Sequence, residues 1–293
     1  MRMDGQDESS NVEDARGSSG GGGFGFGGGR SIGLGTVVIA LVAGWIFGIN
    51  PLTVLGLLSG GEAPIAQSAP GPVHAPPADD VQAKFVSQVL RSTEVVWGDA
   101  FRQAGRSYQN PRLTLYRGSY PTGCGQGQAT MGPFYCPADA HVYLDMGFFD
   151  TLRAQLGAPG QFAQAYVVAH EVGHHVQHLL GITDKVDAAR ERGSAAQANA
   201  MSVRLELQAD CFAGVWTKLS QAEQGWRLEQ GDIETALNAA SQIGDDTLQR
   251  RARGQVVPES FTHGSSAQRV GWFKRGFGAG SIAQCDTFDA PAQ

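Results

Sequence analysis

Apolar residues recur at helix-compatible spacing in several stretches after residue 80. Residues 111–144 differ, because short apolar alternations there are separated by turn residues, which is typical of short strands. The predicted helices cover residues 81–101, 162–180, 199–219, 233–243 and 265–276. We therefore expect residues 81–293 to form one α+β domain in which helices dominate.

The first 80 residues lack the pattern of a folded domain. Residues 1–30 are polar and acid-rich and then almost entirely glycine, so we expect a disordered leader. Residues 31–59 contain no charged residue and are long enough to cross a bilayer as one transmembrane helix. Residues 60–80 are rich in proline and alanine, which is typical of an extended linker.

The flanks of the apolar run indicate its role and orientation. Small residues at Ala63 and Ala66 also suit a signal-peptide cleavage site, but the long polar leader and the length of the run favour a permanent anchor. The three arginines of the leader precede the run, and no lysine or arginine follows it before Lys84. The positive-inside rule therefore places the N-terminus in the cytoplasm and residues 81–293 in the periplasm or outside the cell.

The segment His-Glu-Val-Gly-His at residues 170–174 is the strongest chemical signal in the chain. Residues four apart on a helix share one face and rise about 6 Å, so His170 and His174 can both reach one metal ion. Glu171 would lie beside that ion and could take a proton from a water that zinc acidifies. His178 lies about 12 Å along the helix from His170, too far to bind the same ion.

A second predicted helix supplies the rest of the candidate site. Two histidines and a water leave one position of a tetrahedral zinc to be filled, and Glu206 is the best candidate ligand. Asp210, four residues later on the same face, could accept the free ring N–H of a ligand histidine and so orient it. Two alternatives remain open: Asp210 binds the ion and Glu206 supports it, or both are exposed acids of an amphipathic helix.

Several segments together carry a family resemblance: residues 11–14, 132–137, 142–145, 170–177, 204–214 and 262–265, with the glycine-rich stretch and the apolar run. In these segments the chain resembles the bacterial putative neutral zinc metallopeptidase family over nearly its whole length. The spacing of Glu206 and Asp210 after the His-Glu-x-x-His helix is also similar to the gluzincin pattern of thermolysin-like peptidases. The resemblance implies a membrane-anchored, zincin-like peptidase domain that acts on a peptide or protein.

Peptide hydrolysis also needs a donor to the oxyanion of the tetrahedral intermediate. His263 is the first choice, because it precedes a predicted helix that starts with the capping-box pair Ser265 and Gln268, and Tyr143 is the second. A structural or surface role for His263 is an equal alternative. Residues 141–145 have strand character and could form either a substrate-pairing edge strand or an ordinary core strand.

All four cysteines fall in the predicted outward domain, which favours disulfides. Cys124 and Cys136 bracket a glycine-rich loop and are the first expected pair, which leaves Cys211 and Cys285 as the second. Four cysteines allow three pairings, so this assignment is a hypothesis.

The net charge of −6 is mild and gives no indication of nucleic-acid binding. We expect a single-pass membrane protein whose outward domain is a zinc peptidase with Glu171 as the general base. The oligomeric state is left open. One alternative is a zinc-stabilised, non-catalytic binding or assembly module of the cell envelope, against which Glu171 argues, because a structural zinc needs no base. Another is a zinc hydrolase of a non-protein amide.

Overall fold

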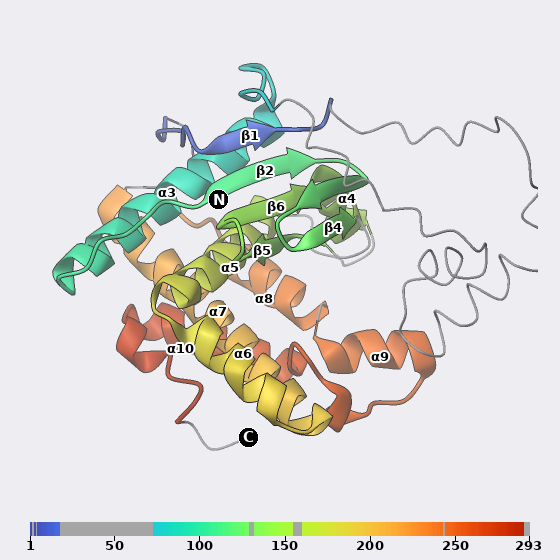
Figure 1. Cartoon of the computed structure of the whole chain (residues 1–293). Coiled ribbons are helices and arrows are strands. Elements are labelled where there is room, and N and C mark those ends of the chain that lie inside the picture. Colours follow the sequence, from blue (N-terminus) through green and yellow to red (C-terminus); the bar gives the residue numbers. More distant parts are fainter. Residues whose placement is uncertain are drawn as a thin grey trace, which may run out of the picture. The chain divides into compact units, whose positions relative to one another are not determined.

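The computed structural model of the 293-residue chain describes residues 1, 3, 5–17, 73–128, 132–154, 160–224, 226–242 and 244–289. These residues belong to one unit, in which a small sheet lies beside a larger group of helices (Figure 1). The expectation of a helix-dominated α+β domain is confirmed.

The main sheet has four strands in the order β1-β2-β6-β5. Their bounds are β1 Val12–Asp14, β2 Arg112–Tyr116, β5 Phe134–Cys136 and β6 His141–Asp145. β1, β2 and β6 run parallel, whereas β5 pairs antiparallel with β6 and is an edge strand. β6 therefore lies inside the sheet, and the suggestion that residues 141–145 form the edge is wrong. Four of its five residues are buried, and since successive side chains point to opposite faces, both faces of this strand are covered.

Five long helices agree in position with the five that apolar spacing predicts. They are α3 Val81–Gln103, α5 Gln161–Leu179, α7 Ala195–Gln224, α8 Asp232–Gln242 and α10 Ser266–Ala279. The predicted capping box is present at the start of α10, where Ser265 and Gln268 exchange hydrogen bonds. The other described elements are helices α4 Met146–Ala154, α6 Ile182–Arg192 and α9 Asp245–Arg253, short 3-10 helices η2 Pro258–Ser260 and η3 Ile282–Gln284, and a hairpin of β3 Ser119–Thr122 and β4 Gly125–Gln128.

Helices α5, α7 and α10 pack backbone against backbone at glycines. A Cβ built on Gly173 of α5 would lie 3.1 Å from the carbonyl oxygen of Ala209 in α7. A Cβ built on Gly276 of α10 would lie 1.9 Å from the carbonyl oxygen of Cys211 in α7, which no real side chain could tolerate. The missing side chains let the three backbones approach closely, so the same stretch of α7 is held between α5 and α10.

The described residues among 1–17 are part of this unit, so the prediction of a disordered leader is wrong for them, whereas its remainder at 18–30 lies outside the described residues. β1 pairs with β2, and Val12 is buried. Glu94 of α3 is buried and accepts hydrogen bonds from the side chains of Ser9, at 2.6 Å, and Asn11, at 2.7 Å. The polar residues that suggested disorder thus find their partners on α3 and β2, which composition alone does not reveal.

Backbone hydrogen bonds join the described residues just before and just after residues 18–72. The backbone N–H of Asp14 donates to the carbonyl oxygen of His74 at 2.7 Å, and the N–H of His74 donates back at 3.1 Å. The predicted transmembrane helix at 31–59 lies outside the described residues, and so does the predicted linker at 60–80 as far as residue 72. Within the described residues, no helix combines the length and apolar character needed to cross a membrane.

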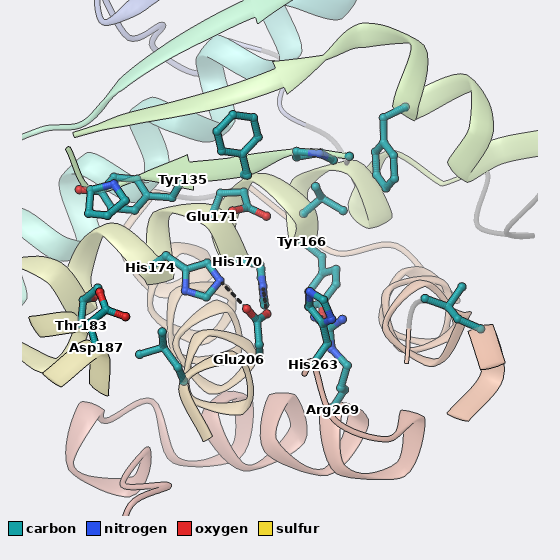
Figure 2. Close-up of a pocket in the computed structure, with 18 of the residues that line it drawn as sticks. Tyr135, Tyr166, His170, Glu171, His174, Thr183, Asp187, Glu206, His263 and Arg269 are labelled. Atoms are coloured by element: carbon teal, nitrogen blue, oxygen red, sulfur yellow. Dashed lines mark hydrogen bonds and ion pairs between the residues drawn. The ribbon is translucent and has the colours of Figure 1, made fainter. Parts of the chain in front are cut away.

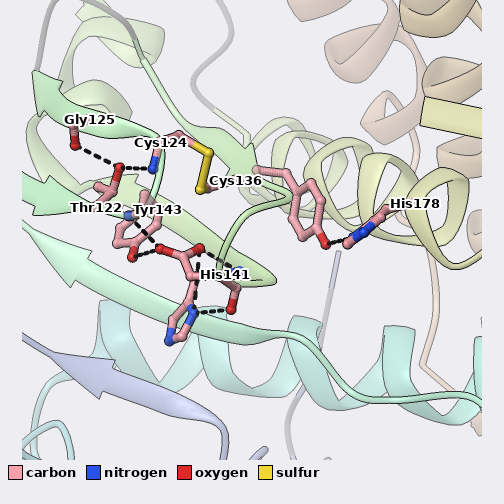
Figure 3. The surroundings of a disulfide bond; sticks show 10 residues. Thr122, Cys124, Gly125, Cys136, His141, Tyr143 and His178 are labelled. Atoms are coloured by element: carbon pink, nitrogen blue, oxygen red, sulfur yellow. Dashed lines mark hydrogen bonds and ion pairs between the residues drawn. A yellow bond between two sulfur atoms is a disulfide. The ribbon is translucent and has the colours of Figure 1, made fainter. Parts of the chain in front are cut away.

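Both expected disulfides are present, Cys124–Cys136 and Cys211–Cys285. The first joins the β3–β4 hairpin to the last residue of the edge strand β5 (Figure 3). The second joins α7 to the segment that follows α10. Each disulfide therefore holds one element whose residues line the candidate site, β5 in the first case and α7 in the second.

Candidate metal centre

The crossing of α5 and α7 brings His170, His174 and Glu206 together (Figure 2). Gly173 lies between the two histidines and packs directly on α7, so the two ligand-bearing faces meet. Oε2 of Glu206 lies 3.1 Å from Nε2 of His170, and Oε1 lies 3.5 Å from Nε2 of His174. Local helix spacing and one close crossing are enough to assemble the cluster.

These three side chains fit a tetrahedral zinc ion. Each offers one ligand atom, and the three atoms lie within 4.8 Å of one another. Zinc bound at about 2.0–2.1 Å with tetrahedral angles places neighbouring ligand atoms about 3.3 Å apart, close to the two distances from Glu206. Two imidazoles and one carboxylate also leave a fourth position for water, which is typical of catalytic zinc. In the described part of the chain, no other group of three such residues has this geometry.

In both candidate histidine ligands, a side-chain oxygen lies within hydrogen-bond distance of Nδ1 and orients the ring. Nδ1 of His170 lies 2.9 Å from Oδ1 of Asp210, which is completely buried. Nδ1 of His174 lies 2.8 Å from Oε1 of Gln177, one turn further along α5. When Nδ1 carries the donated proton, Nε2 keeps its lone pair for a metal. The geometry therefore favours Glu206 as the ligand and Asp210 as the orienting group, and Asp210 is not an exposed acid.

Protons and a metal ion would compete for this cluster. Burial disfavours charge on His170, but Asp210 and Glu206 outweigh burial and raise the pKa of the imidazole to about 10. Burial also opposes ionisation of Glu206, but His174 and His170 outweigh it and hold the pKa of that carboxyl well below its usual value. The carboxylate is thus ionised and ready for a cation, whereas a metal must displace the proton from His170.

Glu171 lies beside the three ligands rather than among them. It follows His170 on α5, is buried, and lines the same cavity. In Figure 2 it lies on the side of the two histidines that faces the sheet, whereas Glu206 lies on the opposite side. A carboxylate that is near a metal but does not bind it can serve as a general base.

The candidate site opens into a cavity of about 880 Å³, within the usual range of ligand pockets. Its wall includes Phe134 and Tyr135 from the edge strand β5. Further apolar side chains come from the loop before β5 and from α4, α5, α7 and α9: Pro133, Phe148, Val167, Leu205 and Leu248. The candidate metal ligands and Glu171 form one polar part of the cavity, and Thr183, Asp187 and Arg190 of α6 add a second polar part beside the apolar wall.

His263 lines this cavity, whereas Tyr143 is not among its lining residues. Nδ1 of His263 lies 3.4 Å from Asp245 at the start of α9, and the Asp245 carboxylate also accepts three consecutive backbone N–H groups of the loop that carries His263. The hydrogen bond to Asp245 raises the pKa of His263. Tyr143 is buried and donates to Asp139 at 2.8 Å. His263 therefore lines the cavity of the candidate site and Tyr143 does not, and the role of His263 as oxyanion donor stays a prediction.

Two residues of the site escaped the sequence reasoning. Tyr166 of α5 donates to Asp210, and Arg269 of α10 forms a buried ion pair with Asp210. Tyr166 lies four residues before His170, so helix spacing could have indicated it. No spacing indicates Arg269, because it comes from a distant helix.

The other two histidines of α5 bind the edge strand instead of the metal. Nε2 of His175 lies 2.7 Å from the carbonyl oxygen of Gln109, so Nε2 donates and Nδ1 is left to accept from the hydroxyl of Tyr135 at 3.0 Å. That hydroxyl can in turn accept from Nδ1 of His178 at 2.7 Å. Burial lowers the pKa of His175 to about 4, which keeps the ring neutral as this chain of bonds requires. Tyr135 thereby links β5 to α5, the helix that carries both candidate histidine ligands.

Comparison with known proteins finds one matching family model and several relatives. The model of the family described as "Putative neutral zinc metallopeptidase" matches residues 1–288, which include β1, α10 and every candidate residue. The chain is 52% identical over 292 residues to "Uncharacterized protein YpfJ" of Escherichia coli, covering 98% of this chain and 99% of that protein. It is 42% identical over 219 residues to "Uncharacterized protein Rv2575" of Mycobacterium tuberculosis, covering 72% and 71%. No solved structure gives a significant match.

Proposed function

Because the chain belongs to the family of putative neutral zinc metallopeptidases, we propose that it hydrolyses peptide bonds with one zinc ion. The observation that carries this proposal is the cluster of three ligand atoms within 4.8 Å, with Glu171 beside it on an 880 Å³ cavity. A closed structural zinc site would use four protein ligands and no neighbouring base.

In this proposal, metal binding, orientation of the ligands, proton transfer and oxyanion binding fall to different residues. His170, His174 and Glu206 hold the metal, while Asp210 and Gln177 orient the two imidazoles. Bound there, zinc would acidify a water molecule and polarise the scissile carbonyl. Glu171 would act as the general base, taking a proton from the attacking water and giving it to the leaving amine. His263, facing the cavity from its loop, donates a hydrogen bond to the developing oxyanion.

We propose that the substrate binds as an extended strand along β5. The edge of the sheet offers backbone donors and acceptors to another strand, and side chains of β5 line the cavity. The hydrogen bonds of Tyr135, the middle residue of β5, and the Cys124–Cys136 disulfide at its last residue hold this edge in place. The apolar wall favours apolar side chains next to the scissile bond.

The decisive test compares the wild-type full-length chain with its full-length Glu171→Gln variant. The full chain is needed, because a chain that begins after the apolar run would lack β1. We expect one zinc per chain in both proteins and a loss of roughly 10²- to 10⁴-fold in cleavage of an unfolded protein by Glu171→Gln. Glu191→Gln, an exposed glutamate of α6, is the matched control and should keep full activity.

The other outcomes separate the alternatives. Full cleavage by Glu171→Gln would overturn the role of the base. Stoichiometric zinc without cleavage of any peptide by the wild type would support a zinc-stabilised binding or assembly module. Cleavage confined to non-protein amides, such as cell-wall peptides, would support a different hydrolase.

We propose further that residues 1–16 and the peptidase domain lie on the same side of a membrane. This differs from a single crossing with a cytoplasmic N-terminus, because β1 cannot pair with β2 across a bilayer. The bond between Asp14 and His74 and the ion pair of Arg16 with Asp80, at 2.6 Å, place both ends of the intervening segment together. The two disulfides favour an oxidising compartment for the domain, and hence for the N-terminus.

A crosslink tests this arrangement in membranes. Ser9 and Ser87 exchange hydrogen bonds with each other's backbone, so Ser9→Cys with Ser87→Cys should form a disulfide. A protease site inserted in residues 60–70 lets the two parts be cut, and neither native disulfide joins them. Fragments that stay joined until reductant is added would support the proposal. Fragments that separate without reductant, as in the single Ser9→Cys control, would refute it.

A further inference from the structure

Arg269 is a buried arginine of α10 whose guanidinium reaches the metal centre through Asp210. Its Nε donates to Oδ2 of Asp210 at 2.8 Å and its Nη2 donates to Oδ1 at 3.0 Å. Arg269 is 2% exposed and Asp210 is completely buried. Water therefore cannot replace either partner, and the two-pronged geometry fixes the plane of the carboxylate.

Asp210 is held by four donors at once. Oδ1 accepts from Tyr166, from His170 and from Arg269, and Oδ2 accepts from Arg269. Nη2 of Arg269 also donates to the hydroxyl of Tyr166 at 3.3 Å, which closes the network. A carboxylate so restrained can present its acceptor to Nδ1 of His170 in one orientation only.

The balance of charges around the candidate ion also indicates a role for Arg269. Glu171, Glu206 and Asp210 are three acids around one candidate ion, and Arg269 is the cation that contacts one of them. By pairing with Asp210, Arg269 leaves Glu206 as the carboxylate free to bind the metal. Without that pair, Asp210 would be a buried, partly unsatisfied anion that could turn towards the metal itself.

We infer that Arg269 is a positioning residue of the metal centre, which acts through Asp210 to hold His170 in its ligand orientation. The inference rests on the proposed zinc site and extends it to α10. Gly276 lets α10 pack directly on α7, and this close packing accompanies the contact of Arg269 with Asp210. The C-terminal helix is thus part of the centre, although none of its residues is proposed to bind zinc.

The test measures metal binding rather than activity. Zinc affinity is obtained by chelator competition, and the visible spectrum of bound cobalt(II) reports the coordination geometry. For full-length Arg269→Met we expect a roughly 10- to 100-fold loss of zinc affinity and a changed cobalt spectrum. Arg269→Lys keeps the charge but loses the two-pronged geometry and should fall between Arg269→Met and the wild type. Arg275→Met, an exposed arginine of the same helix, is the control and should match the wild type.

A double-mutant cycle separates positioning from mere packing. If Arg269 acts through Asp210, Arg269→Met should cost little further zinc affinity in an Asp210→Asn background. Equal losses in both backgrounds, or an unchanged affinity and cobalt spectrum in Arg269→Met, would overturn the inference. Should Arg269→Met fail to fold, Arg269→Lys decides by the same two measurements. A wild type that binds neither ion would overturn the proposed function and this inference with it, whereas tight binding by every variant overturns the inference alone.

Discussion

Replacing Gly173 by alanine should weaken zinc binding while leaving the free energy of unfolding almost unchanged. In a helix interior alanine is favoured over glycine by about 0.8–1.0 kcal/mol. The new Cβ would lie 3.1 Å from the carbonyl oxygen of Ala209, about 0.3 Å inside ordinary contact. Overpacking of this kind costs about 1–3 kcal/mol, and one methyl group belongs at the low end. The two effects on stability therefore nearly cancel.

The affinity for zinc, unlike the free energy of unfolding, should change in Gly173→Ala. Relief of the contact moves α5 away from α7 by about 0.3 Å, and both histidines move with it from Glu206. Zinc–ligand distances tolerate only about 0.2 Å, so we expect a loss of zinc affinity of roughly tenfold. Urea unfolding in the presence of chelator gives the stability, and chelator competition gives the affinity.

Gly98 of α3 provides the matched control, because a Cβ built there meets nothing within 4 Å. Gly98→Ala should stabilise the protein by about 0.8–1.0 kcal/mol and leave zinc affinity unchanged. The reasoning is refuted if Gly173→Ala is as stabilising as Gly98→Ala and binds zinc as the wild type does.

Three further outcomes are expected. The raised pKa of His170, about 10, means that zinc must displace a proton, so zinc affinity should rise about tenfold per pH unit around neutrality, and a flat profile would contradict the proton competition. Burial opposes ionisation of Asp245, but hydrogen bonds from His263 outweigh burial and lower the pKa of the carboxyl group. The ionised carboxylate therefore stabilises the folded protein above about pH 3.9, and this contribution is lost as the pH falls through the lowered pKa. Asp245→Asn should remove that part of the acid dependence of urea unfolding. Replacing both Cys124 and Cys136 by serine should cost about 3 kcal/mol of stability and raise KM more than it lowers kcat, because β5 loses one of its two ties; an unchanged KM would argue against substrate binding along β5.

Much of the candidate site follows from local spacing. His170 and His174, and likewise Glu206 and Asp210, are four residues apart, and helix geometry alone puts each pair on one face. Apolar spacing located the five long helices, and the capping box marked the start of α10. Such patterns depend on contacts within one or two helical turns, so they can be recognised without knowledge of the tertiary structure.

Other features depend on partners that are distant in sequence. The polar residues before Arg16 suggest disorder until Glu94 and β2 supply their hydrogen bonds. Residues 141–145 look equally like an edge or a central strand, and only the pairing of β6 with both β2 and β5 decides.

The sequence by itself determined the chemistry of the centre: two histidines, a base and two acids, each set on one helix face by a period of 3.6 residues. The tertiary structure decided that Glu206 faces the histidines, that Asp210 lies behind His170, and that Arg269 completes the network from α10. The physical reason is that these contacts exist only where helix backbones meet at Gly173 and Gly276, and close packing of distant segments leaves no period in the sequence.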